Sequence, residues 1–161
     1  MKAISKLGWT AYGLAALVIL VDQLSKYWIL YVYDLPGRFS TPIVGPLSLT
    51  MVWNRGVSFG LFTADQDLMR WVLTLFSVGV AIALAVWARK AARPFLGIGL
   101  GLVIGGAIGN AIDRFRFGAV VDFIDVQRLG FFPWVFNIAD SAITIGVVFL
   151  LLDSMRKESA A

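Results

Sequence analysis

The chain contains neither cysteine nor histidine among its 161 residues. Their absence excludes a disulfide framework, a cysteine nucleophile, a Ser-His-Asp triad, a histidine zinc site and a haem ligated by His or Cys. Carboxylates, hydroxyls, lysines and amides remain for catalysis. Charged residues are also scarce at 15%, whereas 59% of the residues are hydrophobic and the mean hydropathy is +0.81. This composition excludes an ordinary soluble domain and indicates a membrane protein.

Four apolar segments are long enough to cross a bilayer, for which a helix needs roughly 20 residues. The first is too long, and too aromatic at its far end, for a cleaved signal peptide, so we expect it to stay in the mature protein. A second soluble domain does not fit, and residues 1–161 are expected to form one membrane domain. The predicted spans cover residues 9–33, 68–88, 95–112 and 135–153.

The net charge is +4, and the positions of the basic residues indicate the orientation of the chain in the membrane and not a nucleic-acid-binding surface. If the basic clusters lie on the cytoplasmic side, both termini are cytoplasmic, and region 34–67 and loop 113–134 face outward. The clusters occupy the chain ends and one connection: Lys2, Lys6, Arg89, Lys90, Arg93, Arg156 and Lys157.

Residues 34–67 interrupt the apolar pattern with prolines and glycines. Near alternation of Thr, Val and Trp over residues 47–53 predicts a strand or hairpin at the membrane surface. The apolar stretch around Phe59, Leu61 and Phe62 predicts a short amphipathic helix. The expected fold is therefore an α-helical membrane protein with four transmembrane helices, a small extracytoplasmic β-region and a short amphipathic helix.

Two serine motifs do not support a serine hydrolase. Ser58 lies in a G-x-S-x-G match at 56–60, but such an elbow needs a base and a buried α/β sheet, for which the chain is too short. Ser25 and Lys26 cannot share a proton, because adjacent residues on a helix point about 100° apart. Lys26 instead follows Asp22 by one helical turn, and the pair either holds the helix end or orients another polar group.

Glycine recurs at every fourth position of the third span. Such a stripe lets another helix approach closely, so helix packing is favoured over the alternative of a substrate groove. The stripe comprises Gly97, Gly101, Gly105 and Gly109.

Two carboxylates are the candidate catalytic groups. Asp140 lies one turn inside the fourth span without a basic neighbour in sequence, so it needs a proton or a partner. Asp122 lies in an apolar run that must return to the membrane, so both can reach the same depth near the outer interface. Two carboxylates there do not both ionise, and the split supplies a general base for water and a general acid for a leaving amine.

Other polar side chains near these carboxylates can hold a peptide backbone within a membrane. Asn137 shares a helix face with Asp140, and Asn54 and Arg114 can serve the same purpose. Interface salt bridges, Asp113 with Arg114 and Arg116 with Asp125, are the simpler explanation for four residues.

Five motifs occur in one order along the chain: D-Q-L-S-K at 22–26, N-R-G-V-S-F at 54–59, G-N-A-I-D-R at 109–114, V-V-D-F at 120–123 and F-N-I-A-D at 136–140. With this set the chain resembles the lipoprotein signal peptidases, or signal peptidase II, which are aspartic proteases of the bacterial inner membrane. One departure is Val57-Ser58, where that family often has Ala-Ala.

The resemblance implies that Asp122 and Asp140 are the catalytic pair and that Asp22 and Lys26 support the site. The implied substrate is a prolipoprotein with a diacylglyceryl cysteine, cut on the amino side of that cysteine near the outer face of the membrane. No metal or cofactor is implied, and globomycin-type cyclic peptides are the expected inhibitors. The resemblance assigns the shape of the substrate site to Asn54, Gly56, Asn110, Arg114, Asn137 and Ala139.

Two other functions fit parts of the sequence. A proton-coupled transporter or channel would use Asp140 as its proton site and the glycine stripe as its path. It is disfavoured because the polar residues gather at one interface, whereas a transport path crosses the membrane. A non-catalytic scaffold would use the polar cluster for packing alone.

Overall fold

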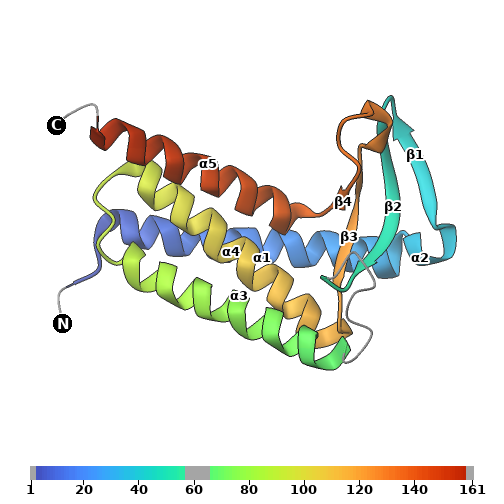
Figure 1. The fold of residues 1–161 in the computed structure, drawn as a ribbon, viewed down its shortest axis with the longest axis horizontal. Coiled ribbons are helices and arrows are strands. Elements are labelled where there is room, and N and C mark those ends of the chain that lie inside the picture. Colours follow the sequence, from blue (N-terminus) through green and yellow to red (C-terminus); the bar gives the residue numbers. More distant parts are fainter. Residues whose placement is uncertain (1–2, 57–65, 159–161) are drawn as a thin grey trace.

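The computed structural model describes residues 3–56 and 66–158. The expected amphipathic helix around Phe59, the Ser58 motif and the Val57-Ser58 departure lie outside the described residues. Within them, long helices run side by side and a small sheet stands across one end, while both termini lie at the other end (Figure 1).

In the described part of the chain, four helices are long and apolar enough to cross a membrane, which confirms the predicted number. The first helix continues as a π-helical turn (Trp28–Val32), so its span covers Lys6–Val32. The helices are α1 (Lys6–Tyr27), α3 (Gln66–Ala88), α4 (Pro94–Phe117) and α5 (Ile138–Glu158).

Several predicted helix ends differ from the structure. The first helix begins at Lys6 and not at 9, and the fourth ends at Glu158 and not at 153. The third helix does not end at residue 112 but continues to Phe117, and it stops where Gly118 adopts a left-handed conformation with φ of +76°. The fourth helix begins at Ile138 and not at 135, because strand β4 (Val135–Phe136) precedes it. Region 113–134 is therefore only partly a loop.

The sheet has four antiparallel strands in the order β1-β2-β3-β4. A short helix, α2 (Leu35–Arg38), leads into it. β1 (Ser40–Val44) and β2 (Leu47–Asn54) form a hairpin, which is one of the two arrangements that the alternation predicted. β3 (Val120–Asp125), which the sequence did not predict, pairs with β2 and carries Asp122 opposite Val52. The β3 pairing thus attaches the segment after α4 to the hairpin after α1.

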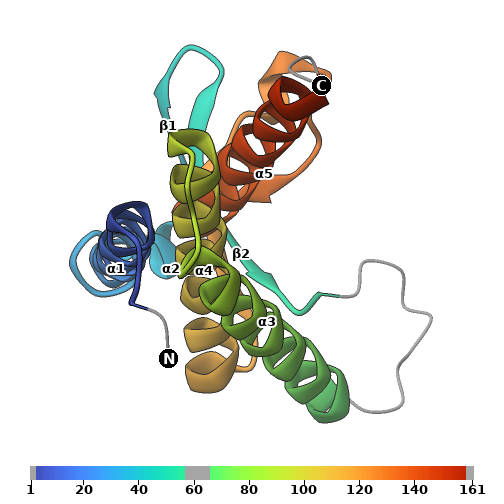
Figure 2. The same cartoon turned by 90° about the vertical axis from the view of Figure 1, so that its left-hand side faces the viewer.

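The central helix is α4, which packs against each of the other three long helices (Figure 2). Toward the termini, small residues such as Ala11 and Ala81 pack around Leu100. Toward the sheet, a second apolar cluster includes Ile29 and Val121. The polar residues of the site lie between these two clusters.

The glycines of α4 permit this close packing. A Cβ added at Gly101 would lie 2.6 Å from the carbonyl oxygen of Ala11, and one at Gly105 would lie 2.8 Å from that of Ala15. A second row on α4, which includes Gly99, faces α5 in the same way. The structure thus confirms helix packing as the role of the stripe.

Gly101→Leu is expected to separate α1 from α4 and to lower the free energy of unfolding by roughly 1–3 kcal/mol, a typical cost of overpacking. Gly79→Leu on α3 is the matched control, because a Cβ there meets nothing within 4 Å. Thermal unfolding in detergent measures both. Equal melting temperatures for the two variants would contradict the packing role.

Candidate active site

Asp122 lies on β3 and is 1% exposed. Each of its carboxylate oxygens accepts a hydrogen bond from a side-chain amide. The side-chain amide of Asn137 donates to Oδ1 at 2.6 Å, and that of Asn54, at the end of β2, donates to Oδ2 at 2.9 Å. Asn54 is oriented in turn by the backbone N–H of Gly56, which donates to its Oδ1 at 2.8 Å. Gly56 thus contributes through its backbone.

Asp140 is positioned by the way α5 begins. Asn137 precedes the helix, and its Oδ1 accepts the backbone N–H of Asp140 at 2.9 Å, while Asp140 Oδ2 accepts the backbone N–H of Asn137 at 3.3 Å. This reciprocal arrangement is a capping box, which satisfies N–H groups that a helix start leaves free. The N-x-x-D spacing therefore both starts the helix and fixes the carboxylate, which is half-buried.

Two asparagines connect the carboxylates. Asn110 on α4 donates from Nδ2 to Asp140 Oδ1 at 2.8 Å. Its own Oδ1 accepts from Asn137 Nδ2 at 3.2 Å, and the same nitrogen also donates to Asp122. Asp122 and Asp140 thus belong to one hydrogen-bonded network with residues from four elements.

Beside this network lies a buried ionic cluster. The ammonium of Lys26 is 2.8 Å from Asp22 Oδ2 and 2.7 Å from Asp113 Oδ2, and it donates to Asn110 Oδ1 at 3.4 Å. Asp22 Oδ1 also accepts the backbone N–H of Ala139 at 3.0 Å. The structure therefore supports both interpretations of the Asp22 and Lys26 pair, because it is an ion pair and it orients groups of the site.

Burial raises the pKa of Asp122 from 3.8 to about 6, and the neighbouring charge of Asp140 acts in the same direction. The hydrogen bonds from Asn54 and Asn137 and the charge of Lys26 oppose this rise. Asp122 therefore holds a proton at a pH where an exposed carboxyl is ionised.

The remaining predicted residues lie around this network. Arg114 is half-buried on α4, one turn after Asn110, and is close enough to Asp140 and Asp122 to attract them. Ala139 is fully buried, and its Cβ would lie 3.4 Å from a Cβ added at Gly109. Ala139 therefore shapes the site by allowing α4 and α5 to pack closely.

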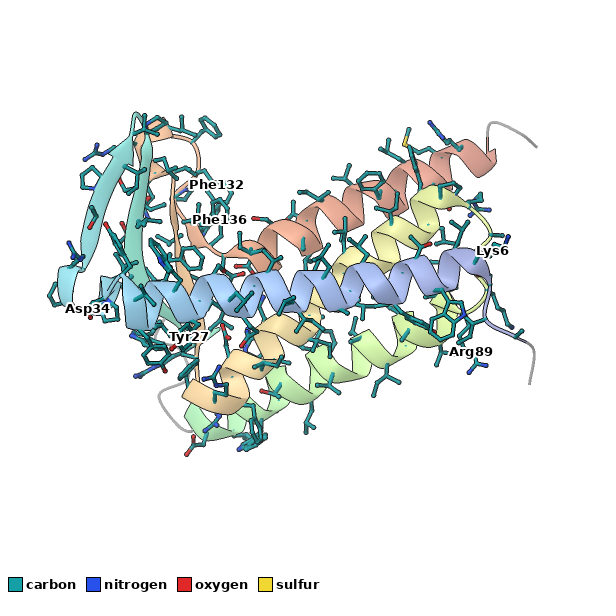
Figure 3. All side chains as sticks on the ribbon, turned by 180° about the vertical axis from the view of Figure 1, so that it is seen from behind. Lys6, Tyr27, Asp34, Arg89, Phe132 and Phe136 are labelled. Carbon is teal, nitrogen blue, oxygen red and sulfur yellow. The ribbon has the colours of Figure 1, made fainter. Side chains whose placement is uncertain are left out.

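An open groove of about 350 Å³ runs along the start of α5 and reaches Asp140. Phe132 and Phe136 form one wall, in the angle between the sheet and α5 (Figure 3). Sequence analysis missed this groove, although helical spacing places Asp140 and Thr144 on one face. The full lining is Phe132, Phe136, Asp140, Ser141, Thr144 and Ile145.

The expected pairing of Asp113 with Arg114 is wrong. Asp113 pairs with Lys26, accepts from Gln23 Nε2 at 2.9 Å and accepts the backbone N–H of Val121 at 3.1 Å. Asp113 therefore connects α1 and α4 to β3. Sequence analysis missed both Asp113 and Gln23 as members of the site, because their contacts join different helices.

The expected pairing of Arg116 with Asp125 is also wrong. Asp125 accepts a hydrogen bond from Thr50 at 2.7 Å, across the sheet. Arg116 lies over the ring of Phe117, 4.8 Å from its centroid. Neither residue reaches the carboxylate network.

Over residues 3–56 and 66–158, no group of three or more His, Cys, Asp or Glu side chains is placed to hold a metal ion.

These helices and this network define a multi-pass membrane protein with a polar centre at one end of its bundle. A family model described as signal peptidase (SPase) II matches residues 14–156. The chain belongs to the signal peptidase II family, proteases that remove the signal peptides of lipoproteins. The predicted resemblance is thereby confirmed, and the protease is favoured over the transporter and scaffold alternatives.

Similar proteins cover nearly the whole chain. The lipoprotein signal peptidase of Caulobacter vibrioides is 56% identical over 157 residues, which make up 97% of this chain and 92% of that protein. That of Methylorubrum extorquens is 44% identical over 146 residues, or 89% and 85%. A bacterial membrane enzyme structure solved by the in meso method at 2.3 Å has a TM-score of 0.80 and 30% identity, covering 99% of this chain and 95% of the other.

Lys26→Met is expected to lower the free energy of unfolding by roughly 3–5 kcal/mol, because it leaves two buried carboxylates without their cation. Asp67→Asn is the control, since it removes only the charge of an 84% exposed side chain in a loose ion pair with Arg70, and it should leave stability nearly unchanged. Unfolding in detergent measures both variants. A Lys26 variant as stable as the Asp67 variant would refute the importance of the cluster.

The raised pKa of Asp122 makes the stability of the protein depend on pH. Because this pKa is higher in the folded chain, the folded state binds more protons than the unfolded state between pH 3.8 and about 6. The contribution of Asp122 to stability therefore falls as the pH rises through this range. Asp122→Asn removes the contribution, so the melting temperature should fall less, or rise more, between pH 4 and pH 6 than in wild type.

The slope is the relevant quantity, because the substitution also changes the hydrogen bonds from Asn54 and Asn137 and so shifts every melting temperature. Asp67→Asn serves as control, since that side chain is 84% exposed, and it should keep the wild-type slope. An Asp122→Asn slope equal to that of wild type would show that Asp122 titrates normally.

Proposed function

We propose that the protein is an intramembrane aspartyl endopeptidase in which Asp122 and Asp140 form the catalytic pair. The observation that carries the proposal is the network itself. Asn110 bonds Asp140, Asn137 bonds both carboxylates, and the two amides bond each other, while Asp140 opens onto a groove. Aspartic proteases need such a pair, with one carboxyl protonated and the other ionised.

The surroundings of the two groups support different roles. Asp140 reaches the groove, where a water molecule can approach it, and it accepts hydrogen bonds from Asn110 Nδ2 and from the backbone N–H of Asn137. It acts as the base that takes a proton from water. Asp122 is buried and its pKa is raised to about 6, so it acts as the acid.

In the reaction, the water oxygen attacks the scissile carbonyl carbon while its proton passes to Asp140. The bond between carbon and nitrogen then breaks, and the Asp122 proton passes to the leaving nitrogen. The products are a carboxyl end on the signal peptide and an amine on the cysteine. Transfer of one proton from Asp140 back to Asp122 restores the starting state.

Cations and amides around the pair bind the substrate. Arg114 is attracted to both carboxylates, and its half-buried guanidinium can donate to a substrate carbonyl. Asn54 and Asn137 hold Asp122 in place, and the exposed side chain of Asn54 can also serve an extended peptide that needs polar partners. Substrate entry is sideways from the bilayer, along the groove on α5.

The substrate is a prolipoprotein whose cysteine already carries diacylglycerol, and the cut falls on the amino side of that cysteine. The largely apolar groove supports this class, because acyl chains or an apolar signal segment can remain in lipid while the peptide bond reaches Asp140. Globomycin-type cyclic peptides inhibit by occupying the same groove.

The charge distribution supports one orientation. Lys6 and Arg89 lie at the end of the bundle that holds both termini, whereas Tyr27 and Asp34 lie at the end that holds the sheet (Figure 3). Basic residues favour the cytoplasmic side. The termini are therefore cytoplasmic, and the sheet and the carboxylates face outward across the bacterial inner membrane.

Asp122→Asn and Asp140→Asn are each expected to reduce kcat for a diacylglyceryl-modified prolipoprotein by at least about 10²–10⁴-fold, the range for acid–base groups. Each purified variant would be assayed in detergent, with globomycin-treated wild type as the blank and Asp67→Asn as the matched control. Melting temperatures establish that the variants remain folded. Wild-type turnover in either folded variant would refute the aspartyl mechanism.

A further inference from the structure

The connection between β3 and β4 exposes several large apolar side chains outside the long helices. This connection, residues 127–134, is here termed the aromatic loop. Phe131 is 77% exposed and Trp134 is 63% exposed, and Leu129 is exposed beside them. The loop contains one cation, Arg128, and no acidic residue. A concentration of exposed apolar side chains of this kind marks an interaction surface.

The loop is an ordered structure in which internal hydrogen bonds fix the backbone. The side chain of Gln127 donates to the carbonyl oxygen of Pro133 at 3.0 Å and closes the loop. The backbone N–H of Gln127 donates to Asp125 Oδ1 at 2.9 Å, and Gly130 has a φ of +79° in the turn between them. The exposed rings are thus held in place on a folded support.

The position of the loop indicates what it contacts. It bulges from the sheet toward the helices, and Trp134 precedes the first residue of the α5 span by four residues (Figure 1). Tryptophan and neighbouring aromatic residues favour the level of the lipid headgroups, and a basic side chain favours the phosphate groups. The loop therefore lies at the level of the outer membrane interface.

The apolar surface of the loop is continuous with the lipid-facing surface of α5. The ring of Trp134 packs on Phe132 at 5.5 Å between centroids, and Phe132 packs on Phe136 at 5.6 Å. Phe132 and Phe136 line the groove together with Ile145, an exposed residue of α5. One apolar surface thus runs from the transmembrane helix, along the groove, to the tip of the loop.

We propose that the aromatic loop inserts Phe131 and Trp134 into the outer-leaflet interface and so docks the mouth of the groove on the lipid surface. The occupant is phospholipid, and Arg128 contacts its phosphate groups. This docking does not depend on the identity of the catalytic residues. Its effect on turnover, in contrast, rests on the proposed substrate being anchored in the same leaflet.

The absence of cysteine permits a direct test, because a single introduced cysteine carries a unique nitroxide label. Labels at Phe131→Cys and Trp134→Cys, in phosphatidylcholine and phosphatidylglycerol vesicles, are expected to collide more often with oxygen than with a water-soluble nickel complex. Arg128→Cys is the control in the same loop and should favour nickel. Gly79→Cys, which faces open space on α3, gives the reference for the bilayer interior.

Labels at 131 and 134 as accessible to nickel as the label at 128 would overturn the proposal. Shielding from both reagents, with spin–spin broadening that grows with protein density, would also overturn it and would indicate a second copy as the occupant.

The kinetic test uses the double variant Phe131→Ser and Trp134→Ser, which replaces no residue that lines the groove. Cleavage of vesicle-embedded prolipoprotein should lose roughly tenfold in kcat/KM through lost apolar burial, while cleavage in detergent micelles stays at the wild-type level. Phe39→Ser is the matched control, since that ring is 77% exposed but precedes β1, outside the loop. Equal losses in vesicles and micelles would instead indicate direct contact with the substrate peptide and would refute lipid docking.

Discussion

One buried cation holds together the elements that form the site. Lys26 on α1 contacts Asp22 on the same helix and Asp113 on α4. These two carboxylates extend the connection, since Asp22 accepts the backbone N–H of Ala139 in α5 and Asp113 accepts that of Val121 in β3. Three helices and a strand therefore meet at a single charge. All three charged side chains are buried, so the loss of one partner leaves a buried charge uncompensated, and the relative positions of these elements are strongly constrained.

The same cation determines how the central amides point. Lys26 can only donate, so Asn110 presents its oxygen to the ammonium and turns its nitrogen toward Asp140. The backbone N–H of Asp140 likewise requires the oxygen of Asn137, which directs the Asn137 nitrogen toward Asp122. Amide orientations are usually ambiguous, but here each is set by a group that can only donate. Hydrogen bonding that favours ionised carboxylates thus opposes burial that favours protonation, and the pKa of Asp122 reflects both.

Sequence alone predicted the features that depend on local spacing. Apolar runs of sufficient length gave the four spans, and the three-residue spacing correctly predicted that Asn137 and Asp140 lie close together, although Asn137 precedes the helix and does not share its face. Contacts between distant elements could not be predicted in this way. Asp113 is adjacent to Arg114 in sequence, yet adjacent helical side chains point apart, and its partner Lys26 is on another helix. The pairing of β3 with β2 and the groove beside α5 similarly depend on how α4 returns the chain to the sheet.

The place of Asp140 within a membrane helix has a geometric consequence. Because Asp140 belongs to the first turn of α5, its depth in the bilayer is set by a rigid helix and not by a loop. The other end of α5 is held at the start of α4 by the ion pair of Arg93 with Asp153. Under the proposed function, acyl chains in the same leaflet set the height of the substrate backbone. The bilayer thereby fixes the distance between the lipid anchor of the substrate and Asp140. This distance selects the bond that is cut, so the enzyme needs to recognise little of the surrounding sequence.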